Sequence, residues 1–347
     1  MSEGEEPARP PRGRATMKDV AKRAGVGIKT VSRVVNAEAY VARATAERVE
    51  RAMNELNYRR DLAAGSLRRS DRRSLTLGLL LANVANPFDA ALHRAAEDVA
   101  QELGVSVLSA SLDERADREQ PFVHALATRR IDGLILMPAS HDHAYLAAEI
   151  AAGMSIVFVD RPPEHLDADC VVVDNQGGAR QAVEHLASFG HRRIAFLGDR
   201  PTLSTASARL EGFLDGVGSL GLSSAASPTI DGLTNEYVAE AAVRSLFEAS
   251  DPPTALFSAQ NLVTVGAIRA LRSLGLEREV ALVGFDDLPL GDLLQPGITV
   301  IAQDAIQIGR LAAERVFARI EGDDSPAQRV VVPTRFIVRG SGEIPAA

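Results

Sequence analysis

The stretch MKDVAKRAGVGIKTVSRVVN, residues 17–36, contains two short helical patterns separated by a turn of small residues. Val20 and Ala24 are four residues apart in the first pattern, and Val31 and Val35 are four apart in the second, so each pair lies on one helix face. A glycine in the turn lets the chain reverse tightly. Two short helices joined in this way form a helix-turn-helix, whose second helix points its first side chains at base edges in the DNA major groove.

The second helical pattern presents side chains suited to reading DNA. Arg33 can donate two hydrogen bonds to a guanine, Lys29 can reach a guanine or a phosphate, and Ile28 can contact a thymine methyl group. Thr30 and Ser32 can hydrogen-bond phosphates and so fix the register on the duplex. The alternative is a surface helical hairpin whose Lys and Arg side chains are only solvated.

The net charge of the whole chain, −8, argues against a nucleic-acid partner, but this charge is unevenly distributed along the sequence. Residues 1–73 hold 17 Lys and Arg against 10 Asp and Glu, a net of +7. Residues 74–347 hold 21 against 36, a net of −15. A basic head on an acidic body indicates that a polyanion meets only the head.

The organisation of the chain follows from where these patterns stop. Residues 1–14 are rich in proline, glycine and charge, and predict a disordered tail. A third helical pattern, ATAERVERAMNELNY, completes a DNA-binding domain over residues 15–59, because short helices must pack on one another to be stable. Residues 60–73 are basic and form a hinge, and residues 74–341 form the core.

After the hinge the sequence alternates between strand-like and helical patterns. Nine short apolar runs, from SLTLGLLLA at residue 74 to ITVIA at residue 298, alternate with Ala-rich helical stretches such as 89–103 and 261–274. Apolar strands with helical crossovers predict an α/β fold of doubly wound parallel sheets. Two sets of about five strands fit two lobes better than one large sheet. We place lobe 1 at about 74–173 and 304–330, and lobe 2 at about 174–303 and 331–341.

Two parallel α/β lobes form a cleft at the carboxyl ends of their strands, where ligands bind. Asp160 and Asp286 each end a strand-like run, Gln260 follows another, and Arg209 lies in STASARLEGF. Such carboxylate, amide and guanidinium groups suit a polyhydroxylated ligand, because they accept from its hydroxyls and donate to its oxygens. The alternative for each aspartate is a turn or a helix cap, which is the role expected for Asp174.

MKDVAKRAGVGIKTVSRVVN, VERAMNELNYRRDLAAGSLRR and the terminal VRGS together resemble the lactose/galactose-repressor (LacI/GalR) family of bacterial transcription regulators. The resemblance spans about residues 15–341. It implies a helix-turn-helix head, a hinge and a core like that of periplasmic sugar-binding proteins, working as a homodimer on pseudo-palindromic operator DNA. Ile28, Lys29 and Arg33 match the family's base-reading positions. Leu67 matches a hinge leucine that enters the minor groove; the alternative is an incidental apolar residue in a flexible linker.

The resemblance also assigns effector-binding positions. Arg209 matches the effector-binding arginine of the S-x-R-x-x-G-F segment, Asp286 the acid after VGF, and Gln303 in IAQD a frequent pocket position. Gln260 stands where many members have asparagine. Asp89 stands where most members have an aromatic ring that stacks on the effector, so it joins the candidates as a polar group in place of a stacking platform.

Three departures from the family pattern fall in the head and hinge. Gly27 replaces a serine that caps the second helix, Ala42 replaces a hydroxyl residue before the third helix, and Arg60-Asp61 replaces a Pro-Asn pair. Glycine is a tolerable N-cap but offers no side-chain contact to a phosphate. We hypothesise that Arg59 and Arg60 restore phosphate binding nearby.

These observations predict a DNA-binding regulator, most simply a repressor of carbohydrate-utilisation genes controlled by a small sugar or polyol effector. A nucleoside or purine corepressor, or an activator role, is the alternative. An enzyme is disfavoured because the sequence shows no nucleophile–base pair, metal-ligand spacing or dinucleotide glycine fingerprint. A transport-type sugar-binding protein is disfavoured by the basic head and by the lack of a signal-peptide pattern.

Several expectations concern what the chain lacks. No catalytic residue, metal or cofactor is expected, and no apolar run reaches the roughly 18 residues of a membrane span, so a cytoplasmic protein without a membrane partner is expected. Cys170, in the apolar run DCVVVD, is expected to be a buried structural thiol. His185 and His191 are expected to be capping or surface residues, because no spaced cluster of metal ligands accompanies them.

Overall fold

The computed structural model describes residues 15–35, 40–59 and 73–346. The chain divides into two compact units, with the boundary between Ser74 and Leu75. The first unit contains the head, and the second contains two lobes that share one cleft.

The head consists of three helices, α1 (Met17–Ala24), α2 (Ile28–Val35) and α3 (Arg43–Glu55). A reciprocal capping box starts α1: the Thr16 side chain accepts from the backbone N–H of Asp19, and the Asp19 carboxylate accepts from that of Thr16. Gly25 ends α1 in the left-handed conformation, with φ of 65°, which a residue without a Cβ adopts at no steric cost. The head core is apolar and is centred on the fully buried residues Val20, Val31 and Val49.

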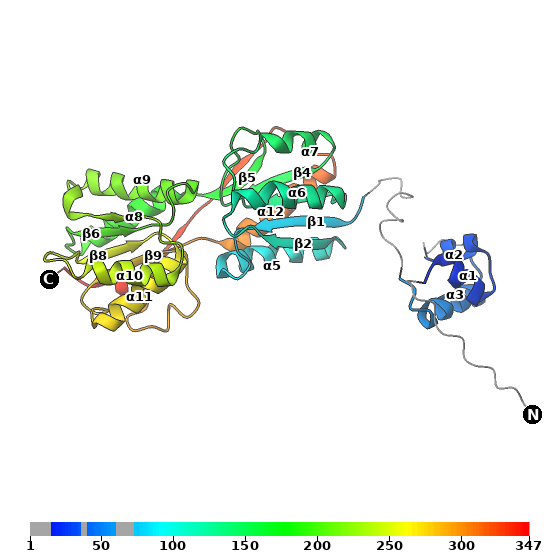
Figure 1. Ribbon diagram of the computed structural model, residues 1–347, viewed down its shortest axis with the longest axis horizontal. Helices are drawn as coiled ribbons and strands as arrows, with labels where there is room; N and C mark the ends of the chain where they lie inside the picture. Colours follow the sequence, from blue (N-terminus) through cyan, green and yellow to red (C-terminus); the bar gives the residue numbers. More distant parts are fainter. Residues whose placement is uncertain (1–14, 36–39, 60–72, 347) are drawn as a thin grey trace, which may run out of the picture. The chain divides into compact units, whose positions relative to one another are not determined.

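Lobe 1 contains a six-stranded parallel sheet in the order β11-β5-β4-β3-β1-β2. Helices α5 and α12 cover one face of this sheet, and α6 and α7 cover the other (Figure 1). The strands are β1 (Thr76–Leu81), β2 (Ser106–Ser111), β3 (Gly133–Leu136), β4 (Ser155–Val159), β5 (Asp169–Val173) and β11 (Arg329–Val332). The helices are α5 (Pro87–Glu102), α6 (Ala116–Thr128), α7 (Ala147–Ala151) and α12 (Ala305–Ile320).

Lobe 2 repeats this plan with a sheet in the order β12-β10-β9-β8-β6-β7. Helices α8 and α9 pack on one face, and α10 and α11 on the other. The strands are β6 (Ile194–Leu197), β7 (Thr229–Ile230), β8 (Ala255–Ser258), β9 (Ala281–Phe285), β10 (Thr299–Ala302) and β12 (Arg335–Ile337). The helices are α8 (Asn175–Ser188), α9 (Ser204–Ser219), α10 (Glu236–Leu246) and α11 (Asn261–Leu274), and short 3-10 turns occupy Ala144–Leu146, Ser224–Ala226 and Ser341–Glu343.

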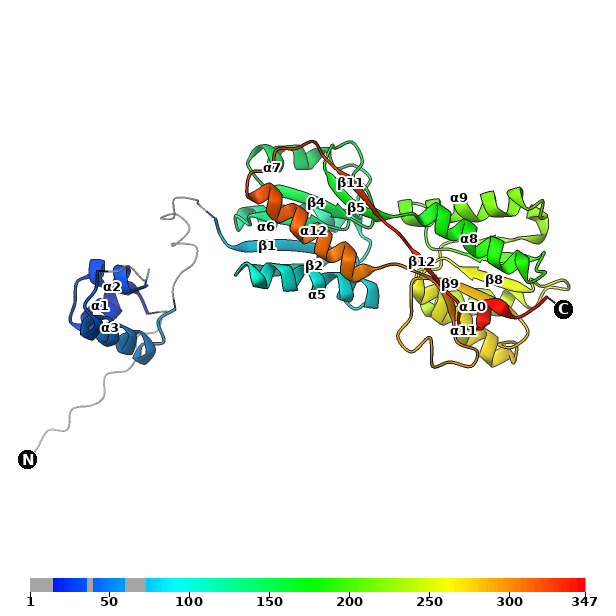
Figure 2. The ribbon, with the colours of Figure 1, turned by 180° about the vertical axis from the view of Figure 1, so that it is seen from behind.

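The predicted fold class is confirmed, and the strand inventory needed correction. Each sheet has six strands where about five were expected. The strands that the sequence did not indicate are β7, β11 and β12, which have two to four residues and no long apolar run. β12 also runs antiparallel to β10, since it comes from a C-terminal segment that returns to lobe 2 from lobe 1. The chain passes between the lobes after β5, after β10 and after β11 (Figure 2).

Burial on both faces of the sheets explains the continuous apolar runs in the sequence. In β1, Leu77, Leu79 and Leu81 pack against α5 and α12, whereas Leu80 packs against the opposite helices. α5 and α12 approach closely at Gly309, where an added Cβ would lie 2.4 Å from the carbonyl oxygen of Leu92. This contact fixes the N-terminal ends of two lobe 1 helices near the cleft.

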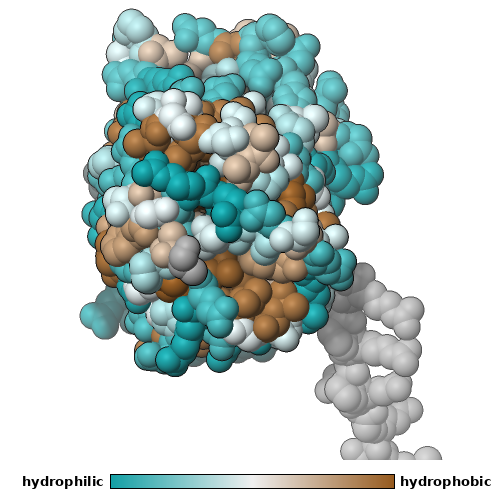
Figure 3. All heavy atoms as spheres, turned by 90° about the vertical axis from the view of Figure 1, so that its left-hand side faces the viewer, coloured by the Kyte–Doolittle hydropathy of each residue, from teal (hydrophilic) through white to brown (hydrophobic). Residues whose placement is uncertain are grey.

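The buried thiol expected at Cys170 is confirmed in β5. No helix among the described residues is long and apolar enough to cross a membrane. The face of the molecule in Figure 3 shows separate hydrophobic patches set among hydrophilic side chains.

Candidate functional site

The second helix of the head exposes the side chains predicted to read DNA. Ile28 is 46% exposed although it is apolar, and Lys29 and Arg33 are exposed beside it. Thr30 and Ser32 are half-buried. An exposed isoleucine beside two cations, on a helix whose other face is buried in the head core, fits a surface that meets base edges and phosphates.

The remaining predicted DNA contacts lie at and beyond the end of the head. Arg59 is exposed just after α3. Leu67 and Arg60 lie outside the described residues, so their predicted roles rest on the sequence. Ala42 is the N-cap residue of α3 and makes no capping hydrogen bond, because its methyl group has no acceptor atom.

Gly27 occupies the position before α2, and its carbonyl accepts from the N–H groups of Thr30 and Val31 at 2.9 and 3.2 Å. An added Cβ would meet no atom within 4 Å. A residue with a side chain would therefore fit at this position. With glycine, α2 lacks the capping hydroxyl that a serine here would supply.

A cavity lies between the two lobes of the core. Its lining comes from residues that follow strands of both sheets, as expected for paired α/β lobes. All six effector-binding residues proposed from the sequence line this one cavity: Asp89, Asp160, Arg209, Gln260, Asp286 and Gln303.

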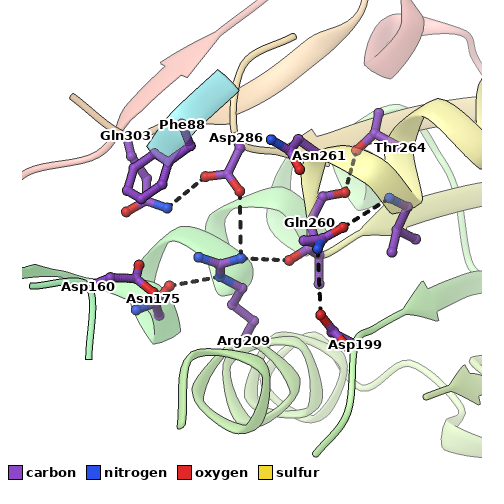
Figure 4. Close-up of polar contacts among 12 residues, drawn as sticks. Phe88, Asp160, Asn175, Asp199, Arg209, Gln260, Asn261, Thr264, Asp286 and Gln303 are labelled. Carbon is purple, nitrogen blue, oxygen red and sulfur yellow. Dashed lines mark hydrogen bonds and ion pairs between the residues drawn. The ribbon is translucent and has the colours of Figure 1, made fainter. Parts of the chain in front are cut away.

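Arg209 lies on α9 and is only 5% exposed (Figure 4). Its Nε donates to Oδ1 of Asn175 at 2.7 Å, and its Nη1 donates to the carbonyl of Ala259 at 2.7 Å and lies 3.8 Å from Oδ2 of Asp286. The guanidinium also stacks on the Phe285 ring, 3.9 Å from its centroid. These contacts hold its plane in one orientation before any ligand binds.

Asp286 and Asp160 occupy equivalent places in the two lobes. Asp286 follows β9 and Asp160 follows β4, and both have left-handed backbones, with φ of 72° and 66°. Such conformations are costly for residues other than glycine and cluster at binding sites. Oδ1 of Asp286 accepts from Nε2 of Gln303 at 2.6 Å, while the buried Oε1 of Gln303 has no partner among the described residues.

A second guanidinium, which the sequence reading missed, lies in the lobe 1 wall. Arg161 is 8% exposed, and its two Nη atoms donate to the Glu114 carboxylate at 2.7 Å each. Nη1 also donates to the carbonyl of Pro138 at 2.8 Å, and Nε lies 3.4 Å from Oδ2 of Asp160. The pattern VFVDR contains this arginine, but nothing local in the sequence indicates its partner 47 residues away.

Burial in the cavity removes water from around several carboxyl groups and so disfavours their charged forms. Burial raises the pKa of Asp89 to about 7, against the lowering effect of a hydrogen bond from the backbone N–H of Asn83. Burial likewise raises the pKa of Asp160 and of Asp199. Groups poised in this way favour a ligand that donates hydrogen bonds to them.

Gln260 combines the predicted contact with a structural role. Its Oε1 caps α11 by accepting from the N–H of Val263 at 3.2 Å, and its Nε2 lies 3.5 Å from Oδ2 of Asp199. Asp174 caps α8, as expected, by accepting from the N–H of Gly177.

The interpretation of the two histidines needs correction. His191 is fully buried, not a surface residue, because Nδ1 meets the Thr254 hydroxyl and Nε2 meets the carbonyl of Ile344 near the C-terminal end. His185 is partly buried and pairs with Glu343. Both therefore attach the C-terminal segment to lobe 2. No group of three potential metal ligands occurs among the described residues.

Comparison with known proteins identifies the family to which the chain belongs. Residues 16–61 match the lacI family of bacterial regulatory proteins, and residues 183–342 match a periplasmic binding protein-like domain. Over 339 residues the chain is 36% identical to the HTH-type transcriptional regulator PtxS of Pseudomonas aeruginosa, covering 96% of this chain and 97% of that protein. The chain belongs to the LacI family of bacterial regulatory proteins. It is a DNA-binding transcriptional regulator, as the head predicted.

Two further relatives match both the head and the core of this LacI-family chain. A ribose operon repressor of Halalkalibacterium halodurans is 31% identical, with 93% of this chain and 96% of that protein covered. The Lac repressor dimer, solved bound to operator and the anti-inducer ONPF, superposes with a TM-score of 0.81 at 27% identity, covering 95% of this chain and 99% of that one.

Proposed function

We propose that this LacI-family regulator is a cytoplasmic homodimeric repressor of carbohydrate-utilisation genes, released from or held on a pseudo-palindromic operator by a small uncharged sugar or polyol. The observation that carries the proposal is the interlobe cavity, in which Arg209 and Asp286 are oriented by protein contacts before a ligand arrives. Oriented donors and acceptors lower the cost of ordering a binding site.

The charge of the cavity supports an uncharged ligand. Five carboxylates and two guanidinium groups line it: Asp89, Glu114, Asp160, Asp199 and Asp286, with Arg161 and Arg209. Each guanidinium already has an acidic neighbour, at 2.7 Å for Arg161 and 3.8 Å for Arg209. A sugar acid or sugar phosphate would find both guanidinium groups already beside carboxyl groups of the protein, whereas the hydroxyls of a polyol can donate to the carboxyl oxygens of the cavity.

Asp89 supports a sugar over a purine. Its side chain is 3% exposed and accepts from the N–H of Asn83 at 2.6 Å, so a carboxyl group occupies a position where a ring would stack on a flat base. Phe88 remains as an apolar part of the wall. We therefore rank a nucleoside or purine corepressor second, to be decided by the experiment below.

The DNA-binding part of the proposal rests on α2 and on the hinge. Arg33, Lys29 and Ile28 read base edges, and Leu67 from each subunit enters the minor groove at the operator centre. The effector favours one arrangement of the lobes and so changes how the paired hinges meet DNA. Leu67→Ala should weaken operator binding while leaving effector binding unchanged, because it lies outside the core.

The proposal is tested by a thermal-shift screen of the full chain against sugars, polyols, sugar acids and nucleosides, followed by mobility shifts on an operator selected from random duplexes. Each hit is repeated with Asp286→Asn, which keeps the side-chain shape. The matched control is Asp287→Asn, since Asp287 pairs with Arg339 and does not line the cavity.

A sugar or polyol should raise the melting temperature of the parent and of Asp287→Asn, and raise that of Asp286→Asn far less. It should also change operator affinity, and the direction of that change shows whether it induces or corepresses. Hits confined to nucleosides would replace the sugar class, and hits that stabilise Asp286→Asn as well as the parent would show that the cavity is not the site.

A further inference from the structure

The N-terminal ends of two helices from different lobes meet beside the effector cavity. Asn86 precedes α5 in lobe 1, and its Oδ1 caps that helix by accepting from the N–H of Phe88 at 3.0 Å. Asn261 is the first residue of α11 in lobe 2, and its Oδ1 accepts from the N–H of Leu262 at 2.7 Å. Asn86 also lines the cavity.

The two amide side chains bond to each other across the cleft. Nδ2 of Asn261 donates to Oδ1 of Asn86 at 2.7 Å, and Nδ2 of Asn86 donates to Oδ1 of Asn261 at 3.3 Å. We call these residues the interlobe amide pair. Among the described residues, no other side chain of 75–173 hydrogen-bonds to a side chain of 174–303.

The pair is placed where small changes in lobe separation break it. Asn261 is 2% exposed, so its amide has no solvent partner while the lobes are closed. A buried amide that loses its partner is unfavourable until water replaces the bond. Both oxygens also lie at helix N-termini, whose partial positive charges attract them. Closing therefore forms the pair, and opening must hydrate both amides.

We infer that the interlobe amide pair holds the cleft closed before the effector binds, and so positions the two walls of the cavity for the effector. Asn86 and Asn261 are positioning residues in this account, because the cavity contacts proposed above come from other side chains. The inference rests on the proposed function for its effect on the effector, but its effect on lobe separation can be measured without one.

Lobe separation is measured in the full, effector-free chain by electron spin-echo distance measurements between labels at Arg94→Cys on α5 and Leu274→Cys at the end of α11. Both positions are exposed, and the native Cys170 is buried. Mixing with excess unlabelled chain leaves one labelled subunit per dimer. The parent is expected to give a narrow distribution of distances.

Three variants break the pair and one control mimics only its side effect. Asn86→Ser retains a capping oxygen for α5 but is too short to reach Asn261, and Asn261→Ala removes the other amide. Asn261→Asp keeps the side-chain shape but replaces the donor of the 2.7 Å bond with a carboxylate oxygen that faces Oδ1 of Asn86, so it should also widen the distribution. Asn235→Ser alters the N-cap of α10, which accepts from Tyr237 and Val238 and does not line the cavity.

Asn86→Ser and Asn261→Ala should each add a population of longer distances, the double variant should show no more than either single one, and Asn235→Ser should match the parent. For any effector found in the screen, breaking the pair should weaken binding about tenfold, the scale of one to two net hydrogen bonds, and Asn235→Ser should bind as the parent does. Unchanged distances in both single variants would overturn the inference, whether or not a sugar binds. A screen without sugar hits would overturn the proposed function alone.

Discussion

The head and the core of this LacI-family regulator present charge in opposite ways. On α2 the candidate DNA contacts Lys29 and Arg33 are exposed. In the core the candidate effector contacts Asp89 and Arg209 are 3% and 5% exposed and are held by other protein groups. The head thus meets a large polyanion with side chains at its surface, whereas the core encloses a small ligand.

This difference sets how each region responds to a mutation. Contacts from exposed cations to phosphates depend on salt, because counterions are released from DNA when they form. Buried charged groups depend on their neighbours, because removing one partner leaves the other without compensation. Substitutions of the buried charged groups in the core should therefore affect stability first, and those of the exposed cations in the head should affect DNA binding.

The largest effect is expected for Arg209→Ala. It leaves Asp286 buried without its nearest cation and removes the stacking contact with Phe285. Loss of one partner of a buried ion pair costs about 3–5 kcal/mol. Urea unfolding of the full chain measures it, with Arg94→Ala, on an exposed pair with Asp98, as the control. Similar small losses in both variants would remove the contrast between buried and exposed charge.

Asp89→Asn should stabilise the core in a pH-dependent way. Burial raises the pKa of Asp89 from 3.8 to about 7, so between these values the folded chain retains a proton that the unfolded chain has lost. The stability of the parent therefore falls as pH rises through this range. The asparagine variant lacks this loss, so its advantage should grow from pH 4 to pH 7 and reach on the order of 4 kcal/mol above it.

Melting temperatures of parent and variant across pH 4–8 test this expectation. Asp98→Asn, on an exposed part of the same helix, serves as the control. A constant difference between Asp89→Asn and the parent at all pH values would mean that burial does not raise the pKa of the Asp89 carboxyl group.

Arg33→Ala should weaken operator binding by about 1–3 kcal/mol and relax the preference at one base pair in each half-site. Arg59→Ala should instead weaken binding on all sequences and reduce the salt dependence by about one counterion. Binding to operators with single base changes, measured at several salt concentrations, separates the two. Equal weakening of Arg33→Ala on every sequence would make Arg33 a phosphate contact.

The smallest effect is expected for Gly27→Ser. The added hydroxyl can cap α2 in open space, which should stabilise the head by a few tenths of a kcal/mol and tighten DNA binding slightly. Gly25→Ser is the matched control, because Gly25 has φ of 65° and a side chain there is strained. Thermal unfolding of the head signal should move upward for the first variant and downward for the second.

How far the sequence predicts this molecule depends on whether the deciding contact is local. Thr16 and Asp19 are three residues apart, so their capping box could be predicted from spacing alone. Asp160 and Asp286 follow apolar strands, and the carboxyl ends of parallel strands meet at one edge, so their meeting in one cavity follows from topology. Arg209 was placed by a motif that the family shares.

The contacts that were missed join residues far apart in the chain. Arg161 and Glu114 are 47 residues apart, and His191 and Ile344 are 153 apart. A histidine after a helix suggests a surface turn until the C-terminal segment is known to cover it. The short strands β11 and β12 form only because that segment lies along both sheets, which no local pattern indicates.

The three passages of the chain between the lobes have a consequence for synthesis. Lobe 1 lacks α12 and β11 until residues 305–332 have been made, and lobe 2 lacks β12 until residues 335–337 follow. Neither sheet can be completed until the segment from residue 305 to residue 337 has left the ribosome. The head, which ends before residue 60, has no such dependence. A nascent chain can therefore contain a finished DNA reader while both halves of its ligand sensor are still incomplete.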